Sequence, residues 1–231
     1  SQEFKRLGVF ADWEKPYLTM SYSYEAAIVK ELGKFVENGS VYNGLKPVHW
    51  CTSCRTALAE AEVEYADHQS PTVFVKFPVK SGLNGELGDV EPTKVNFVIW
   101  TTTPWTLPAN LAVALHPEFQ YSAVAINKEV YVVADKLLSK LVLDWGIKEY
   151  EILGTCLGAD LEEVVCRHPF IDRDSRIVLG EHVTLEQGTG CVHTAPGHGQ
   201  EDYVVGQKYG LETYNPVDDG GVFKSDVAEF R

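Results

Sequence analysis

Short runs of apolar and β-branched residues, separated by turn residues, dominate the chain from position 71 onward. Runs of this kind predict short β-strands, and few helical patterns lie between them. Such a chain is expected to have an α+β fold, with a mostly antiparallel, partly closed β-barrel-like core and peripheral helices. The predicted strands cover residues 72–79, 95–100, 119–126, 130–134, 150–153, 164–167, 176–179 and 182–185.

Three segments are predicted to be helices, the first two from apolar residues at helical spacing and the third from its acidic first turn and its end signals. The first follows Ser23, a candidate N-cap, and stops at Gly39. The second covers 135–145, and the third runs over 200–209 before a closing glycine. Residues 56–65 give conflicting signals, because alanine and glutamate favour a helix while apolar residues alternate with glutamate as in a strand. For this segment we expect a helical turn that leads into a strand.

The segment from residue 95 to residue 114, VNFVIWTTTPWTLPANLAVA, joins a buried strand to a polar end. Three hydroxyls follow the strand, at Thr101, Thr102 and Thr103, and two prolines then prevent the strand from continuing. A threonine triplet is often ordinary β-structure. Successive strand residues point to opposite faces, however, so at least one hydroxyl faces inward and needs a partner. This rigid polar strand end is therefore a candidate binding site.

A glycine-rich segment over 187–199, QGTGCVHTAPGHG, leads into the third helix. Its glycines allow tight turns and close approach of a ligand to the backbone. His193 and His198 flank a proline turn, and Asp202 lies in the first turn of the helix. Each has a structural alternative, since Asp202 also suits the helix dipole and His193 alone is more often a hydrogen-bonded core histidine than a catalyst.

The bulk composition is that of a globular domain, with 231 residues of which 45% are hydrophobic and 23% charged. No apolar run is long enough to span a bilayer, and the first residues lack the apolar core of a signal peptide. We therefore expect a soluble chain with no membrane partner, in the cytoplasm or in an organelle matrix. Five cysteines, an odd number, suit a reducing compartment.

Cys51 and Cys54 form a CxxC pair, which is half of a tetrahedral zinc site. The remaining cysteines offer no second pair. Two free thiols are therefore the simpler interpretation, and a second pair beyond Arg231 in a longer protein would complete a structural site.

The net charge is −13, and residues 151–231 hold 15 acidic against six basic residues. Phosphate contacts supply much of the affinity of proteins for nucleic acids, so an acidic domain binds RNA weakly by itself. If this chain handles an RNA, another part of a larger protein has to hold most of it and present only its end.

Two segments together resemble a known family. WTTTPWTLPANLAVALHPEF and GTGCVHTAPGHGQEDY are similar to the signature segments of the editing domain of isoleucyl-tRNA synthetases, an insertion in class I synthetases. The sister domains of the valyl and leucyl enzymes carry arginine after two threonines, where this chain has Thr103, which favours the isoleucyl branch. The resemblance covers nearly the whole chain. It implies that residues 1–70 form a stem and helical flank joining the synthetic core, and that residues 71–231 form the editing β-barrel core.

The resemblance also implies a role for each site residue. Asp202 matches the acid that binds the α-ammonium group of the substrate, and His193 matches the wall of a pocket that admits valine and excludes isoleucine. The other matches are three hydroxyls along the ester and terminal adenosine, a supporting amide and a pocket floor: Thr101, Thr102, Thr103, Asn110 and Trp100. We thus expect the threonines and Asn110 to be catalytic, Trp100, His193 and Asp202 to bind substrate, and no residue to bind a metal.

The implied reaction is post-transfer editing, the hydrolysis of the ester in valyl-tRNA(Ile). A binding pocket discriminates poorly between two amino acids that differ by one methylene group. Isoleucine and valine in isoleucyl-tRNA synthetases are the standard example, and a second site there hydrolyses the wrong product. The ester is already activated, so no nucleophilic thiol is needed, and a Cys191–His193 pair is disfavoured. The implied partners are the tRNA 3′ end carrying valine and the synthetic core of the same polypeptide. No cofactor is expected in this fragment, because ATP and magnesium serve the synthetic core.

Two other functions fit the sequence less well. A full synthetase is disfavoured because neither an HxGH nor a KMSKS type of ATP-handling motif is present. A binding module or inactive remnant is expected to have a damaged site, whereas the residues that match the family are all in place.

Overall fold

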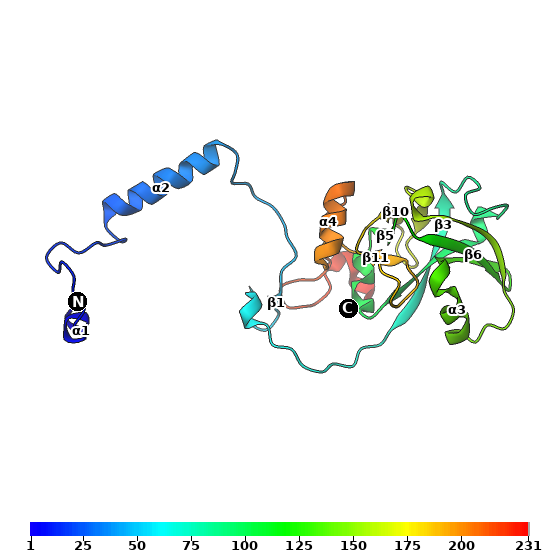
Figure 1. The fold of residues 1–231 in the computed structure, drawn as a ribbon, viewed down its shortest axis with the longest axis horizontal. Coiled ribbons are helices and arrows are strands. Elements are labelled where there is room, and N and C mark those ends of the chain that lie inside the picture. Colours follow the sequence, from blue (N-terminus) through cyan, green and yellow to red (C-terminus); the bar gives the residue numbers. More distant parts are fainter. Residues whose placement is uncertain (231) are drawn as a thin grey trace. The chain divides into compact units, whose positions relative to one another are not determined.

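The computed structural model describes residues 1–230 and divides into two compact units, Ser1–Leu45 and Lys46–Arg231 (Figure 1). The first unit contains two helices, α1 (Gln2–Arg6) and α2 (Tyr22–Glu37). No side chain of this unit is buried, and the apolar residues of α2 are exposed. The N-cap of α2 is Ser21 and not Ser23, which already lies within the first helical turn.

The second unit is built on one nine-stranded sheet with the order β11-β5-β10-β9-β3-β4-β7-β6-β8. Its bounds are β3 (Val73–Ser81), β4 (Val95–Thr101), β5 (Ala112–Leu115), β6 (Gln120–Ile126), β7 (Glu129–Ala134), β8 (Glu151–Leu157), β9 (Val165–Arg167), β10 (Asp174–Leu179) and β11 (Val192–Thr194). The helices are α3 (Asp135–Asp144) and α4 (Gln200–Tyr209), with 3-10 turns η1 (Glu60–Glu62), η2 (Pro92–Lys94), η3 (Pro104–Ala109), η4 (Gly158–Leu161) and η5 (Ser225–Phe230).

The sheet is mostly antiparallel, with parallel pairing only between β4 and β7 and between β5 and β10 in the described strands. The edge strand β11 lies against β4, although the two are not neighbours in the hydrogen-bonded order. Just before β11, the Cys191 thiol donates to the Val132 carbonyl of β7 over 3.6 Å, and the Ala134 backbone N–H donates to the Thr189 carbonyl over 2.8 Å. The sheet therefore curls back on itself without closing, and the predicted α+β fold with a partly closed barrel-like core is confirmed.

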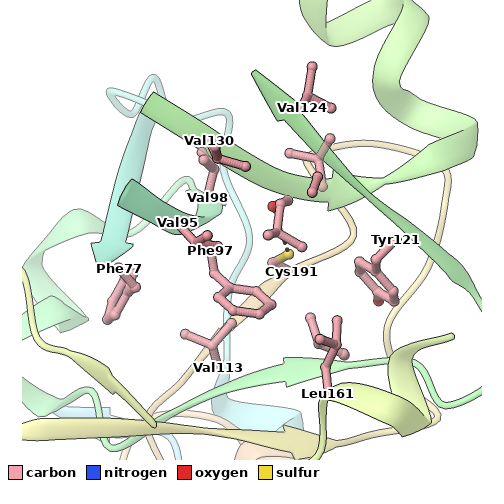
Figure 2. Close-up of a cluster of buried hydrophobic side chains, with 14 of the residues drawn as sticks. Phe77, Val95, Phe97, Val98, Val113, Tyr121, Val124, Val130, Leu161 and Cys191 are labelled. Atoms are coloured by element: carbon pink, nitrogen blue, oxygen red, sulfur yellow. Dashed lines mark hydrogen bonds between the residues drawn. The ribbon is translucent and has the colours of Figure 1, made fainter. Parts of the chain in front are cut away.

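The interior of the curled sheet holds the main hydrophobic core. Figure 2 shows Phe97, Val113, Tyr121 and Leu161 around the Cys191 thiol, and all five side chains are buried. Burial raises the pKa of Cys191 well above its usual range. This thiol is therefore part of the hydrophobic packing, and it does not act as a nucleophile paired with His193.

The strand expected at residues 182–185 is wrong, because this segment is a turn and loop. Its alternating pattern arises from apolar side chains that pack on the core, as buried Val183 does, without pairing to another strand. Residues 56–65 form the short strand β2 (Thr56–Ala57) and then η1, so the expected order of helical turn and strand is reversed. Strand β5 was missed, because it is only four residues long and two of them are alanine, which is depleted in strands.

The boundary between the units lies at residues 45 and 46, earlier than the division at 70 and 71 expected from the family resemblance. The hairpin of β1 (Trp50–Cys51) and β2 lies within the second unit, where the indole N–H of Trp50 donates to the Asp219 carbonyl over 3.0 Å. A functional division into stem and editing core stays a prediction. None of the helices within residues 1–230 has the length and apolar character needed to cross a bilayer.

Candidate active site

The polar end of β4 turns out of the sheet through its own threonines. The Thr101 hydroxyl accepts the Thr103 backbone N–H over 3.1 Å and lies 3.3 Å from the Thr103 hydroxyl. Thr101 is buried, whereas Thr102 is exposed and its carbonyl accepts a hydrogen bond from Ser70 over 2.6 Å. One hydroxyl of the triplet therefore faces inward, as the alternation of a strand requires.

The turn continues as η3, which the hairpin of β9 and β10 holds from outside. The Nε2–H of His168 donates to the Leu107 carbonyl over 2.8 Å. The Arg173 guanidinium donates to the carbonyls of Pro108 and Asn110, each over 3.0 Å. Two prolines deprive η3 of N–H donors, so these contacts from outside fix its backbone.

His193 lies on β11, opposite Val113 of β5, with only 8% of its surface exposed. Both ring nitrogens have protein partners: Nδ1 lies 2.8 Å from Asn110 Nδ2, and Nε2 lies 2.9 Å from the Thr106 hydroxyl. Burial, followed by the neighbouring imidazoles of His168 and His198, lowers the pKa of His193 to about 3. The ring is neutral at physiological pH and has no free nitrogen for proton transfer.

Asp202 lies in the first turn of α4 and folds back toward the end of β11. Its Oδ2 accepts the Ala195 backbone N–H over 2.9 Å. A Cβ at Gly199 would lie 2.9 Å from the Asp202 carboxyl carbon, so glycine at this N-cap leaves room for that orientation. Burial is the main cause that raises the pKa of Asp202 to about 6, and the Ala195 N–H opposes it. No lysine or arginine forms an ion pair with Asp202 within residues 1–230.

These elements enclose a cavity of about 210 Å³ between the end of β4, η3, β11 and α4. Five of the predicted site residues line it: Trp100, Thr101, Thr103, His193 and Asp202. Two others do not: Thr102 points to solvent, and Asn110 lies behind His193 as its hydrogen-bond partner. The cavity lining also includes Thr106, Val192, Ala195 and His198, which the sequence had not identified as site residues.

Two of the missed residues carried a detectable signal. Thr106 follows Thr103 by three residues, which is one turn of a 3-10 helix, so both lie on one side of η3. His198 comes four residues before Asp202 in the glycine-rich segment. Its ring contacts Trp105 edge to face at 5.3 Å, and burial lowers the pKa of its imidazole.

Cys51 and Cys54 lie at the turn of the β1–β2 hairpin, away from this cavity lining. The Cys54 backbone N–H donates to the Cys51 sulfur over 3.3 Å, and both thiols are free. Within residues 1–230, no cluster of three or more His, Cys, Asp or Glu side chains is arranged to hold a metal ion.

A family model for class I tRNA synthetases (I, L, M and V) matches residues 1–196. The chain belongs to this family. Among its curated relatives are isoleucine–tRNA ligases, and the resemblance to the isoleucyl branch is confirmed. The Syntrophotalea carbinolica ligase is 56% identical over 100% of this chain and 25% of its own length. The Desulfotalea psychrophila ligase is 55% identical over 99% of this chain and 24% of its own length. The chain thus spans about a quarter of the length of these class I relatives.

Two solved structures also match in part. GlLeuRS-CP1 has a TM-score of 0.44 and 22% identity over 52% of this chain and 51% of that chain. The editing domain of the P. knowlesi cytosolic leucyl-tRNA synthetase has a TM-score of 0.43 and 17% identity over 56% of each chain. At TM-scores below 0.5, this likeness bears on neither substrate nor mechanism.

Proposed function

We propose that this chain is the post-transfer editing domain of an isoleucyl-tRNA synthetase, and that it hydrolyses the ester of valyl-tRNA(Ile). The observation that carries the proposal is Asp202, a partly buried carboxylate that lines a small cavity and has no cationic partner among residues 1–230. Burying a carboxylate in this way is unfavourable unless a ligand supplies the missing charge. An α-ammonium group meets that need.

The size of the cavity supports an amino-acid side chain as its occupant. About 210 Å³ lies below the roughly 300–1,000 Å³ of ordinary small-molecule pockets. The His193 ring is held on both nitrogens, so it forms a fixed wall. A close-packed wall of this kind excludes a larger side chain by overlap, which supports valine as the accepted group and isoleucine as the rejected one.

The hydrolytic step in this proposal uses no covalent intermediate. Thr101 and Thr103 place two hydroxyls beside the ammonium site, where they can hold the ester carbonyl and a water. The neutral His193 imidazole takes no proton, because both of its nitrogens are engaged. The tRNA 3′ end enters as substrate, and the synthetic core of the full-length ligase supplies most of the contact with tRNA, since this chain carries a net charge of −13.

A deacylation assay with valine-charged and isoleucine-charged tRNA(Ile) tests the proposal. The parent chain should hydrolyse the valyl ester and spare the isoleucyl ester. Asp202→Ala removes a charge-assisted contact of about 1.5–3 kcal/mol, so valyl ester hydrolysis should fall by about ten- to 150-fold. Glu201→Ala is the matched control, because this exposed neighbour on α4 is not part of the cavity lining.

A second substrate isolates the ammonium contact. Acetylation of the α-amino group of valyl-tRNA removes its charge, so the parent chain should hydrolyse the acetylated ester as slowly as Asp202→Ala hydrolyses the normal one. Equal rates on free and acetylated substrate would remove Asp202 from the role of ammonium anchor. Hydrolysis of neither ester, with the parent chain in large excess over the tRNA so that weak binding does not limit the rate, would refute the editing function itself.

A further inference from the structure

We propose that Thr106 is a positioning residue that holds the His193 imidazole as the neutral, Nε2-protonated ring, and that this fixed ring sets the size limit of the pocket. The second part, the size limit of the pocket, rests on the proposed editing function. The protonation state itself follows from hydrogen bonds at the two nitrogens, and each can be worked out separately.

The Nδ1 side is decided by Asn110. The nitrogen Nδ2 of Asn110 lies 2.8 Å from the Ala112 carbonyl and 2.8 Å from His193 Nδ1. A carbonyl only accepts hydrogen bonds, so the amide group facing Ala112 has to be the NH₂ group, and rotating the amide would place two oxygens in contact. The same NH₂ group then donates its second hydrogen to His193, and Nδ1 carries no proton.

The Nε2 side is decided by Thr106. Its hydroxyl lies 2.9 Å from the Thr103 backbone carbonyl, which can only accept, so the single hydroxyl hydrogen points there. Toward His193 Nε2, 2.9 Å away, the hydroxyl oxygen can then only accept. Nε2 therefore carries the proton. The two sides give the same tautomer independently, and no element of the arrangement requires a charged ring.

Of the two hydrogen-bond partners of His193, Thr106 is the one that lines the cavity. It lines the cavity together with Thr103 and His193, and it bonds to both. Asn110 is fully buried behind the ring, and its own backbone is held by Arg173. Loss of the Thr106 hydroxyl leaves a buried imidazole N–H without a partner. This favours rotation of the ring or a change to the other neutral tautomer. A ring that moves no longer excludes the extra carbon of isoleucine.

The variants Thr106→Val and Thr106→Ser separate the hydroxyl from the shape of the side chain. Valine keeps the branched shape and removes the hydroxyl, whereas serine keeps the hydroxyl and removes the methyl group. Relative to the valyl ester, hydrolysis of the isoleucyl ester should rise about tenfold in Thr106→Val and stay at the parent level in Thr106→Ser. His193→Ala provides the reference for complete loss of the wall.

Long-range ¹H–¹⁵N NMR of the histidine rings reads the proton position without any editing assay. In the parent chain and in Thr106→Ser, the His193 ring should show the Nε2-protonated pattern from pH 8 to pH 5. The titratable groups near this ring are His168 and His198, and Asp202 lines the same cavity. Thr106→Val should show a second tautomer or a broadened signal. An Nδ1-protonated parent ring, or one that titrates near pH 6.5, overturns the proposal, as does unchanged selectivity in a folded Thr106→Val. If the parent ring is as expected but neither ester is hydrolysed, the editing function fails and the tautomer assignment stands.

Discussion

At the scale of single residues, Asp202 and His193 have opposite relations to charge. His193 is buried and Asp202 is partly buried, and burial disfavours the charged form of each. For His193 this yields a neutral ring with two satisfied nitrogens. For Asp202 the pKa of about 6 still leaves the carboxylate ionised at pH 7.5, with the Ala195 N–H as its backbone partner. The site therefore contains one charge held at a cost to stability.

That cost depends on pH in a predictable direction. The folded-state pKa of Asp202, about 6, lies above its ordinary value of 3.8. The folded state therefore binds the proton more tightly, so the favourable contribution of protonation is complete below the ordinary value and is lost as pH rises through the folded value. Above pH 6 the ionised carboxylate lowers the free energy of unfolding by roughly 1–3 kcal/mol.

Asp202→Asn should remove this penalty. Asparagine still accepts the Ala195 N–H but carries no charge, so the variant should be more stable than the parent by roughly 1–3 kcal/mol at pH 7.5. The difference should shrink steadily between pH 6 and pH 4. Urea unfolding of both proteins across this range measures it, and Glu212→Gln, at an exposed glutamate that is not among the groups acting on the pKa of Asp202, is the control. A gain of equal size at every pH would point to packing and not to charge.

At the scale of elements, the site depends on η3, a segment whose own backbone hydrogen bonds are too few to fix its conformation. Pro104 and Pro108 give η3 its turn but remove two N–H donors from it. Its carbonyls at Leu107, Pro108 and Asn110 are instead bonded by side chains from the β9–β10 hairpin. The hairpin therefore supports the site from outside, since neither His168 nor Arg173 is part of the cavity lining.

Arg173→Gln should loosen η3. A shorter, uncharged side chain cannot bond both carbonyls, so we expect a loss of roughly 1–3 kcal/mol in the free energy of unfolding. Amide hydrogen exchange should accelerate at Thr106 and Asn110, whose N–H groups bond within this turn. Arg167→Gln, at an exposed arginine on the neighbouring strand, is the control and should leave both quantities unchanged. Equal exchange rates in parent and Arg173→Gln would show that η3 is held without the guanidinium.

At the scale of the whole molecule, the chain is two units with different degrees of burial. The sheet, its core and the cavity all belong to Lys46–Arg231. The unit Ser1–Leu45 has no buried side chain and carries an amphipathic helix whose apolar residues are exposed. Burial of apolar surface is the main favourable term in folding, so stability resides in the second unit.

Removal of residues 1–45 should therefore leave the second unit folded. Calorimetry of the 46–231 piece should give the Tm of the parent within about 2 °C, a shift that corresponds to less than roughly 1 kcal/mol for a domain of this size. Near-ultraviolet circular dichroism of the five tryptophans, one of which lies in the removed segment, gives a second check. A large drop in Tm would mean that the first unit stabilises the sheet.

The sequence by itself determined the features that arise from local pattern. Runs of apolar and β-branched residues located β4, β6 and β7, and helical spacing located α2 and α3. An acidic first turn and a closing glycine located α4. The polar strand end and the glycine-rich segment also pointed to the residues that meet in one cavity. The pattern failed where a strand is short and rich in alanine, as in β5, and where a loop packs like a strand, as at residues 182–185.

Only the tertiary structure decided the protonation and charge of the site. The two partners of His193 lie 87 and 83 residues away in the chain, at Thr106 and Asn110. The burial that raises the pKa of Asp202 and the packing that makes Cys191 inert depend on elements from several parts of the sheet. Hydrogen-bond partners and local dielectric are set by what surrounds a residue in space, and periodicity along the chain contains no information about those neighbours.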